Sequence, residues 1–513
     1  MKKHAKQLFW NTLLLTAVTL LIRTVGVGFQ VYVSNHAGAE AMGLFSLMSG
    51  VYGFALTLAT SGIHLGVTHV VVDAVGRNTP ERVAPVMRRA VIYALSFGVG
   101  TALLLTLTAE PIGIHWLRDD RTVRSLRLFG TSLPLIALSS VFNGYFTALR
   151  RSYKTAATQV FEQGVKIGAT MALLVAFTEG EIEAICCALV LGGVLAEVAS
   201  FFLNLGLYCF DRCRNFPAKA AKSAPGDARA LVKVALPVAL TAYLRSGLIT
   251  LQHILIPEGL RNSGSSHREA LMAYGSIHSM ALPIVLYPAA LISSCAGLLI
   301  PEIAECHVRR HTKRISYMIS RVWWLALVFS IGVAGILICF SEEIGQALYP
   351  GSGTAAYIRL LAPLVPIMYI DTATDAVLKG LGEQVYTMNV NIIDALISVI
   401  MVWLLVPRFG IGGYLVTIYV SEFFNTVFSI THLLSLARPT LRLVKWIYKP
   451  LLAIVGATTL TKLVFRLPGL PPLPWGLALG VCILLYLGLL LLFGDADRED
   501  LGWFRSLFCK ETH

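Results

Sequence analysis

Two stretches of this sequence repeat one pattern: LLIRTVGVGFQ at residues 20–30 and AYLRSGLITLQ at residues 242–252. In each stretch an arginine stands seven positions before a glutamine inside an apolar run. Arg23 therefore corresponds to Arg245, and Gln30 corresponds to Gln252. Because apolar helices resemble one another by chance, this match alone is weak evidence for an internal repeat, and a second match is required.

The second match has nearly the same offset. It pairs Pro134-Leu135 with Pro363-Leu364, Leu149-Arg150 with Leu378-Lys379, and Thr158 with Thr387. Together the two matches predict two copies of a six-helix set. Since six is an even number, both copies insert with the same orientation, related by an axis along the membrane normal. We expect lobes over residues 1–220 and 221–440, followed by two additional helices and a cytoplasmic tail over 441–513.

The composition is that of an integral membrane protein. Of 513 residues, 56% are hydrophobic and only 14% are charged, and the mean hydropathy is +0.70. Soluble chains carry roughly 25% charged residues, so this chain lacks the polar surface that separate soluble domains need. The same numbers exclude a disordered chain and a secreted disulfide scaffold.

A helix needs about 20 apolar residues to cross a bilayer, and the sequence contains fourteen such runs. They cover approximately 8–33, 41–67, 90–108, 128–148, 156–178, 183–210, 229–256, 271–299, 317–340, 355–379, 386–406, 410–436, 446–465 and 474–493. The expected fold is therefore all-α, with about fourteen transmembrane helices.

The basic residues indicate the orientation of these helices. With both termini cytoplasmic, the inner segments hold 29 Lys and Arg residues and the outer loops hold 8. This asymmetry follows the positive-inside rule and predicts a multi-pass membrane protein with both termini cytoplasmic; the resemblance described below implies the bacterial cytoplasmic membrane. It also explains the net charge of +13 without a nucleic-acid partner.

Several charged side chains lie within the predicted spans, where each costs about 2.5–3.5 kcal/mol unless it meets water or a partner. Arg23 and Arg245 are predicted to face a shared cavity and pair with a phosphate group; the alternative is a snorkelling or structurally paired arginine. Glu162 and Lys166 stand four residues apart, the spacing of an intrahelical ion pair. They are either a mutually neutralised pair or a second substrate contact. Glu197 on the next span is a candidate partner for Lys166 or for Arg23.

The second half is acidic instead. Asp371, Asp375, Asp394 and Glu422 lie in three consecutive spans, and clustered membrane carboxylates bind Na⁺ or carry protons. Local hydrogen bonding to neighbouring side chains is the alternative. We expect no cofactor beyond such an ion or the membrane potential.

No motif of an enzyme is present. The sequence lacks a Gly-rich phosphate loop, an HExxH zinc motif and a GxSxG nucleophile motif. No pair among the nine cysteines has zinc spacing. The protein is therefore predicted not to be an enzyme and to hold no metal centre.

Some segments resemble a known family. They are LIRTVGVGFQVYVSNHAGAEAMGLFSLM (21–48), ATSGIH (59–64), FNGYFTALRRSYKTAATQVFEQGVKI (142–167), LLIPEIAE (298–305) and VLKGLGEQVYTMNV (377–390). The chain resembles the stage V sporulation protein B type of polysaccharide-biosynthesis membrane proteins, in the multidrug/oligosaccharidyl-lipid/polysaccharide flippase superfamily, related to lipid II flippases. Arg23 and Glu162 match residues of that family, whereas Gln30 and the SGIH segment depart from its common pattern.

The resemblance implies two six-helix lobes around a central cavity, alternating access, and roles in peptidoglycan or other cell-wall polysaccharide synthesis, including sporulation. The resemblance implies an undecaprenyl-pyrophosphate-linked saccharide as the substrate, with Arg23 and Glu162 among the residues that bind it. From the repeat and the charges within the spans, we expect Gln30, Lys166, Arg245 and Gln252 to complete the binding site. Implied partners are this substrate, membrane lipids and cell-envelope synthesis enzymes, with a monomeric protein.

Three alternatives stay open. The first is a Na⁺- or H⁺-coupled extrusion transporter of organic cations that uses the carboxylates of the second half. The second is a membrane scaffold without transport activity, and the third is an integral-membrane glycosyltransferase. The arginine of the first span, its repeat partner and fourteen rather than twelve spans favour the flippase.

Overall fold

The computed structural model describes residues 2–76, 80–176, 181–215, 226–437, 439, 442, 444–465 and 475–493. Within these residues every regular element is a helix. This confirms the predicted all-α class, because a helix satisfies its backbone polar groups internally and so suits a bilayer. Eleven described helical segments are long and apolar enough to cross a membrane.

The chain packs as two compact units, one of residues 1–279 with 391–417 and the other of residues 280–390 with 418–513. This division follows packing rather than sequence repetition, so the lobe boundaries at 220 and 440 stay a prediction. The first unit contains α1 (Lys2–Thr60), α2 (Ile63–Gly76), α3 (Val83–Pro111), α4 (Thr122–Ala148), α5 (Ser152–Ala176), α6 (Ile182–Asn215), α7 (Gly226–Asn262) and α8 (His267–Gly275).

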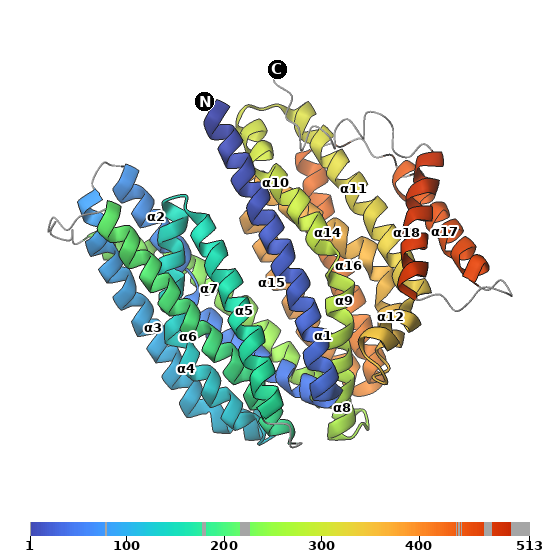
Figure 1. The fold of residues 1–513 in the computed structure, drawn as a ribbon, viewed down its shortest axis with the longest axis horizontal. Helices are drawn as coiled ribbons and strands as arrows, with labels where there is room; N and C mark the ends of the chain where they lie inside the picture. Colours follow the sequence, from blue (N-terminus) through green and yellow to red (C-terminus); the bar gives the residue numbers. More distant parts are fainter. Residues whose placement is uncertain are drawn as a thin grey trace. The chain divides into compact units, whose positions relative to one another are not determined.

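In the first unit α3, α4, α6 and α5 lie side by side in that order (Figure 1). The core shared by α2, α3, α4 and α6 contains the ring pair Phe142 and Tyr208, with centroids 5.1 Å apart, together with Val67, Met87 and Tyr145. Helix α5 packs against α6.

The helix α1 contains two of the predicted spans. Gly38 interrupts it with φ 77° and ψ 167°, a backbone conformation open to glycine but strained for other residues. The predicted runs 8–33 and 41–67 lie on either side of this kink. A second left-handed glycine, Gly62 (φ 76°), separates α1 from α2.

Glycines also allow close approaches between helices. A Cβ at Gly43 of α1 would stand 2.0 Å from the carbonyl oxygen of Leu271 on α8, and a Cβ at Gly275 would stand 2.3 Å from that of Ala39. The backbones of α1 and α8 are therefore in direct contact just after the kink. These two helices were assigned to different lobes from the sequence.

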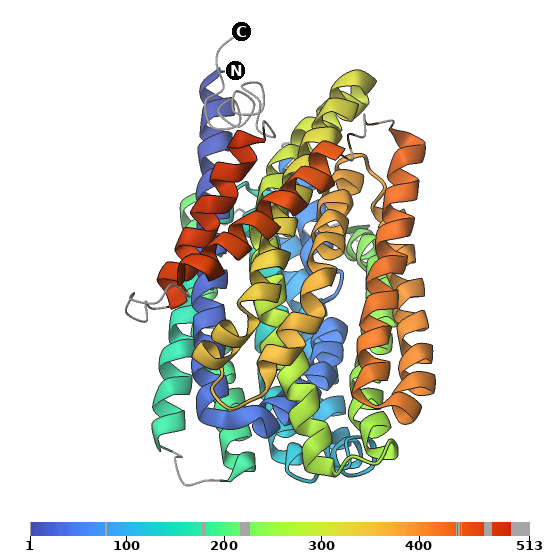
Figure 2. The same ribbon diagram turned by 90° about the vertical axis from the view of Figure 1, so that its right-hand side faces the viewer.

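The second unit consists of α9 (Leu282–Leu286), α10 (Ala289–Val308), α11 (Thr312–Cys339), α12 (Ser341–Leu348), α13 (Thr354–Leu361), α14 (Val365–Gly380), α17 (Lys449–Phe465) and α18 (Trp475–Leu492). It also holds parts of α15 (Gln384–Phe409) and α16 (Ile411–Leu436). The two C-terminal helices α17 and α18 pack side by side and against α11 (Figures 1 and 2). Tyr486 of α18 ties them by donating a 2.6 Å hydrogen bond to the carbonyl of Val328.

Prolines break two of the predicted spans. The run 271–299 is not one helix: α8 continues through a π-helical segment (Ser276–Ala281) into α9, and α10 begins after Pro288. The run 355–379 is divided at Pro363 by a 3-10 turn between α13 and α14. Helices also occupy the predicted ranges 156–178, 229–256 and 410–436, although they are not among the eleven segments; the number fourteen stays a prediction.

Two further features differ from the sequence expectation. The short helix α12 lies in a segment between predicted spans and begins with Glu342 and Glu343, so its hydropathy gives no sign of it. The cytoplasmic tail predicted after residue 493 lies outside the described residues.

Candidate polar transport site

The first helix places Arg23 on a polar face. Gln30, seven residues later, shares this face, and a Cβ at Gly26 between them would lie 3.6 Å from the side-chain amide of Gln163 on α5. Leu21 and Val25 are 58% and 42% exposed and lie about 160° around the helix from Arg23, at about 100° per residue. The apolar face is thus turned away from the face that Arg23 shares with α5.

The Arg23 side chain is exposed and has no ion-pair partner among the residues that the structure describes. Gln30, by contrast, is engaged: its Nε2 donates a 2.8 Å hydrogen bond to the carbonyl of Ser279. Arg23 and Gln30 therefore differ in their contacts. Arg23 has no ion-pair partner among the described residues, whereas the Gln30 amide connects α1 to the segment after α8.

Helices α5 and α6 contribute an acidic and basic cluster. Ser200 of α6 donates a 2.8 Å hydrogen bond to the half-buried carboxylate of Glu162. Lys166 interacts electrostatically with Glu162 and with Glu197 of α6, while its own side chain is exposed. The structure therefore brings Glu162 and Lys166 together, as their spacing predicts, and Glu197 interacts with both.

Tyr52 extends this cluster towards α1. Its hydroxyl lies 3.0 Å from the hydroxyl of Ser132 on α4, its ring stacks on Phe129 at 4.1 Å, and it interacts electrostatically with Glu197 and Glu162. Nothing in the sequence marked this tyrosine, because its partners come from α4, α5 and α6. It forms one wall of the polar site.

Arg245 on α7 is also exposed and without an ion-pair partner in the described part of the chain. Its neighbours on the adjoining face fix α7 against α1: Thr57 donates to the Ser246 hydroxyl at 3.1 Å, and Thr250 donates to the Gly50 carbonyl at 2.9 Å. Gln252, seven residues after Arg245, shares its face. Among the described residues no polar contact joins Arg245 to Arg23.

The predicted ion-coupling carboxylates are half-buried. Asp371 and Asp375 of α14 and Glu422 of α16 belong to the second unit, whereas Asp394 of α15 belongs to the first. All four take part in polar interactions. No group of three or more His, Cys, Asp or Glu side chains in the described residues is arranged to hold a metal ion.

A charged network in the first unit was not predicted as a functional feature. Asp119, 6% exposed, accepts hydrogen bonds from the backbone amide, Nε and Nη2 of Arg121, and lies 3.0 Å from Nε2 of His267 on α8. Arg121 also pairs with Glu40 of α1 at 3.2 Å. We call Glu40, Asp119, Arg121, His267 and Arg268 the Asp119 network; Arg268 joins it through Glu40 at 3.1 Å.

Neighbouring donors and charge favour the ionised form of the Asp119 carboxylate. Burial alone would raise the pKa of Asp119, but hydrogen bonds from Arg121 and His267 and the charge of Arg121 outweigh it, so the pKa is lowered. Close by, Arg118 pairs with Glu258 of α7 at 2.9 Å. The network joins segments before residue 220 to α7 and α8, and mixed charges near 118–121 were its only signal in the sequence.

The stretch 142–167, which resembles the family named above, contains residues that form ion pairs and a hydrogen bond at the C-terminal end of α4. Tyr145 donates a 3.0 Å hydrogen bond to the buried carboxylate of Asp211 at the end of α6, and Lys154 contacts the same carboxylate at 2.5 Å. Arg151 forms a further ion pair with it. These contacts tie α4, α5 and α6 together beyond the polar site.

Comparison with known families agrees with this architecture. A family model described as polysaccharide biosynthesis protein matches residues 8–307, more than half of the chain. The chain belongs to this family. A second model, MatE, matches residues 264–404.

Curated relatives of this family member cover most of its length. It is 24% identical over 412 residues to stage V sporulation protein B of Bacillus subtilis (strain 168), covering 80% of each chain. It is 22% identical over 431 residues to the lipid II flippase MurJ of the same organism, covering 77% of each. The probable multidrug resistance protein NorM of Caulobacter vibrioides is 24% identical over 423 residues, 76% of this chain and 83% of that one.

Solved structures share the fold. The lipid II flippase MurJ in an inward closed conformation superposes with a TM-score of 0.71 at 12% identity, covering 94% of this chain and 99% of that one. An inward-facing multidrug resistance MATE family transporter of the MOP superfamily gives 0.65 at 14% identity, covering 82% and 97%. The family member is thus a multi-pass membrane protein with the fold of transporters.

Proposed function

We propose that this protein is a flippase that moves an undecaprenyl-pyrophosphate-linked saccharide, such as lipid II or a related cell-envelope precursor, across the bacterial cytoplasmic membrane by alternating access. The observation that carries the proposal is the exposed Arg23 on the α1 face that meets α5, opposite the apolar face, without an ion-pair partner in the part of the chain that the structure describes. A guanidinium inside a membrane helix needs an anionic partner or water. The likeness to MurJ supplies the substrate class.

The polar site has the chemistry for a pyrophosphate headgroup. Arg23 presents a planar fork of donors that matches phosphate oxygens bidentately, and Lys166 adds a compact second cation one helix away. Glu162, held by Ser200, neutralises Lys166 while the site is empty, and phosphate oxygens replace that carboxylate when the headgroup enters. Arg245 and Gln252 provide the equivalent contacts from α7, as the repeat predicts.

Alternating access requires each end of the site to open in turn. The Asp119 network and the contact of Gly43 with α8 close one end of the first unit, so opening this end requires α8 to separate from α1. With both termini cytoplasmic, this closed end is the outer one. The substrate headgroup then enters from the inner leaflet while its lipid tail stays in the bilayer.

Energy for transport comes, in this proposal, from the membrane potential or from Na⁺ or H⁺ bound at Asp371, Asp375, Asp394 and Glu422, with no other cofactor. The protein acts as a monomer without enzymatic activity of its own. It receives its substrate from the membrane enzymes that assemble the lipid-linked saccharide, in peptidoglycan synthesis during growth or sporulation.

A second candidate function is coupled extrusion of organic cations. It is favoured by the MatE match over residues 264–404 and by the fold shared with the MATE transporter. Unpaired arginines in the first unit oppose it, because a cationic substrate is repelled by them.

Complementation distinguishes the two functions. A bacterial strain depleted of its own lipid II flippase should regain growth when it expresses this protein, and its sensitivity to ethidium should not change. Absence of rescue at normal membrane levels, with increased ethidium resistance, would contradict the flippase and support the extrusion transporter.

A further inference from the structure

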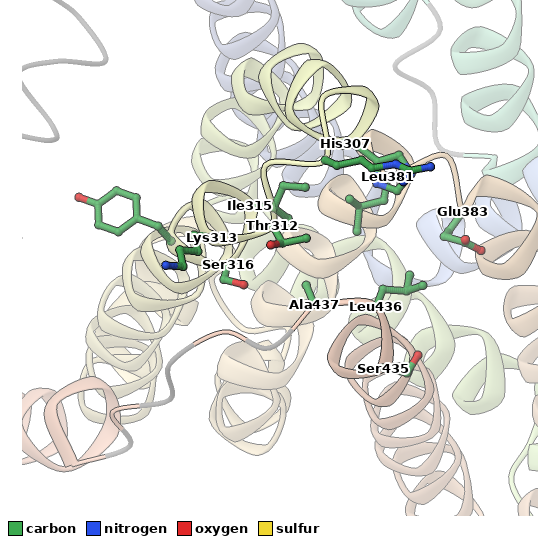
Figure 3. A pocket seen from close by; sticks show the side chains of 12 residues that line it. His307, Thr312, Lys313, Ile315, Ser316, Leu381, Glu383, Ser435, Leu436 and Ala437 are labelled. Atoms are coloured by element: carbon green, nitrogen blue, oxygen red, sulfur yellow. The ribbon is translucent and has the colours of Figure 1, made fainter.

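A basic pocket of about 780 Å³ lies in the second unit, where the α10–α11 turn, the α14–α15 turn and the C-terminal end of α16 meet (Figure 3). Its volume falls within the range of about 300–1,000 Å³ typical of ligand sites. The three segments that line it are predicted inner loops. The pocket is remote in sequence from the residues of the proposed transport site.

Lys and Arg residues outnumber acidic residues in the lining of the pocket by two to one. Arg310 and Lys313 both line it, and neither has an ion-pair partner within the described ranges of the chain. The acidic lining residue Glu383 faces His432, at 3.2 Å from its Nε2. The pocket therefore offers two cations, together with His307, to an external anion.

The two neighbouring arginines behave differently. Arg309 pairs with Glu305 at 2.8 Å, and Arg314 pairs with Glu302 at 2.5 Å. Neither lines the pocket. The α10–α11 turn thus carries two arginines in ion pairs outside the pocket, Arg309 and Arg314. Arg310 and Lys313 line the pocket and have no ion-pair partner among the described residues.

The backbone holds Arg310 in place. This residue has φ 57°, in the left-handed region where helix ends favour glycine, and the turn closes with a 2.9 Å hydrogen bond from the His311 amide to the Cys306 carbonyl. At the facing α14–α15 turn a glycine, Gly382, takes the corresponding position with φ 87°. Arg118 and Arg150 adopt the same left-handed conformation elsewhere in the described residues, so the backbone defines where Arg310 starts but not what its side chain binds.

The opposite wall of the pocket is apolar. Figure 3 shows Ile315 and Leu381 around the hollow, with Leu436 and Ala437 below them. Leu436 is 46% exposed, so the apolar wall continues to the outside of the helix bundle. A ligand that satisfies both walls has an anionic head and a hydrocarbon tail.

We infer that the basic pocket binds the phosphodiester headgroup of an anionic membrane lipid. Arg310 and Lys313 pair with the phosphate, the hydroxyls of Thr312 and Ser316 donate to its oxygens, and an acyl chain packs on Leu436. Basic pockets between helices at the cytoplasmic surface bind such headgroups. The volume far exceeds the needs of a lone phosphate ion, since one water occupies about 30 Å³.

Native mass spectrometry of the full-length protein, delipidated and titrated with phosphatidylglycerol, tests this inference. Arg310→Asn combined with Lys313→Gln should weaken binding about tenfold or more, because each cation near a membrane surface contributes to anionic lipid binding. Asparagine is chosen because it tolerates a positive φ. Arg309→Gln with Arg314→Gln removes the same charge outside the pocket and should leave the affinity within about twofold, since exposed pairs contribute little.

Phosphatidylcholine and glycerol phosphate serve as further probes. Phosphatidylcholine should bind all three proteins equally, and soluble glycerol phosphate should compete only at far higher concentration. Equal losses in the two double variants would reduce the effect to general surface charge and overturn the inference. Glycerol phosphate that binds as tightly as the lipid would overturn the lipid assignment. Since the readout is lipid binding, failure of the flippase proposal leaves this result unaffected.

Discussion

Ser200 of α6 donates a 2.8 Å hydrogen bond to the carboxylate of Glu162 on α5. Lys166, one helical turn after Glu162, interacts with the same carboxylate but keeps an exposed side chain. The Ser200 hydroxyl and the charge of Lys166 therefore both act on the Glu162 carboxylate.

Removal of this hydrogen bond should impair transport more than stability. Ser200→Ala leaves Glu162 without its neutral donor, at a cost of about 1 kcal/mol, and frees the carboxylate to hold Lys166 more tightly. We expect a several-fold lower rate of lipid translocation in liposomes and a melting temperature within a few degrees of wild type. Ser96→Ala on α3, whose hydroxyl bonds only the carbonyl of Ile92 among described residues, is the control and should be unaffected.

The contact between α1 and α8 should be intolerant of any side chain. Gly43→Ala places a methyl group 2.0 Å from the Leu271 carbonyl, an overpacking that typically costs about 1–3 kcal/mol. The variant should shift towards an opened outer end, seen as faster labelling of a cysteine introduced at Ala39. Gly53→Ala on the same helix meets nothing within 4 Å; equal labelling of both variants would show that the contact does not hold the closed state.

Acid should weaken the Asp119 network. The pKa of Asp119 is lowered on folding, so its stabilisation is complete above the unfolded value of about 3.9 and is lost as the pH falls through the folded value. At pH 7 Asp119→Asn should lower the free energy of unfolding by about 2 kcal/mol, because charge-assisted hydrogen bonds are lost. Melting curves between pH 7 and 3 should show this difference shrinking only below about pH 4; a constant difference would contradict the lowered pKa.

Much of the fold followed from the sequence because bilayer thickness sets helix length. The run 183–210 became α6 (Ile182–Asn215), and the run 128–148 became α4 (Thr122–Ala148). Local breaks were harder to place. The run 271–299 was predicted as one span, whereas in the structure α10 starts anew after Pro288 and reaches Val308.

The polar site was predictable in part for a similar reason. Charges four residues apart on one helix must lie together, which is why Glu162 and Lys166 were found. Tyr52 and the Asp119 network join segments far apart in the chain, and hydropathy carries no information on such pairs. The hydrogen bond from Gln30 to Ser279 likewise gives this glutamine a structural role that its place in the repeat did not reveal.

The most direct test of the central claim is translocation of fluorescent lipid II by the purified protein in liposomes, comparing wild type with Arg23→Gln, Arg245→Gln and Arg88→Gln. Arg88 is an exposed arginine near the start of α3, and its variant loses the same charge away from the site. We predict that wild type and Arg88→Gln translocate equally, while the other two variants fold normally but are at least about tenfold slower, since each loses a charge-assisted hydrogen bond to phosphate. Undiminished translocation by Arg23→Gln and Arg245→Gln would contradict the account.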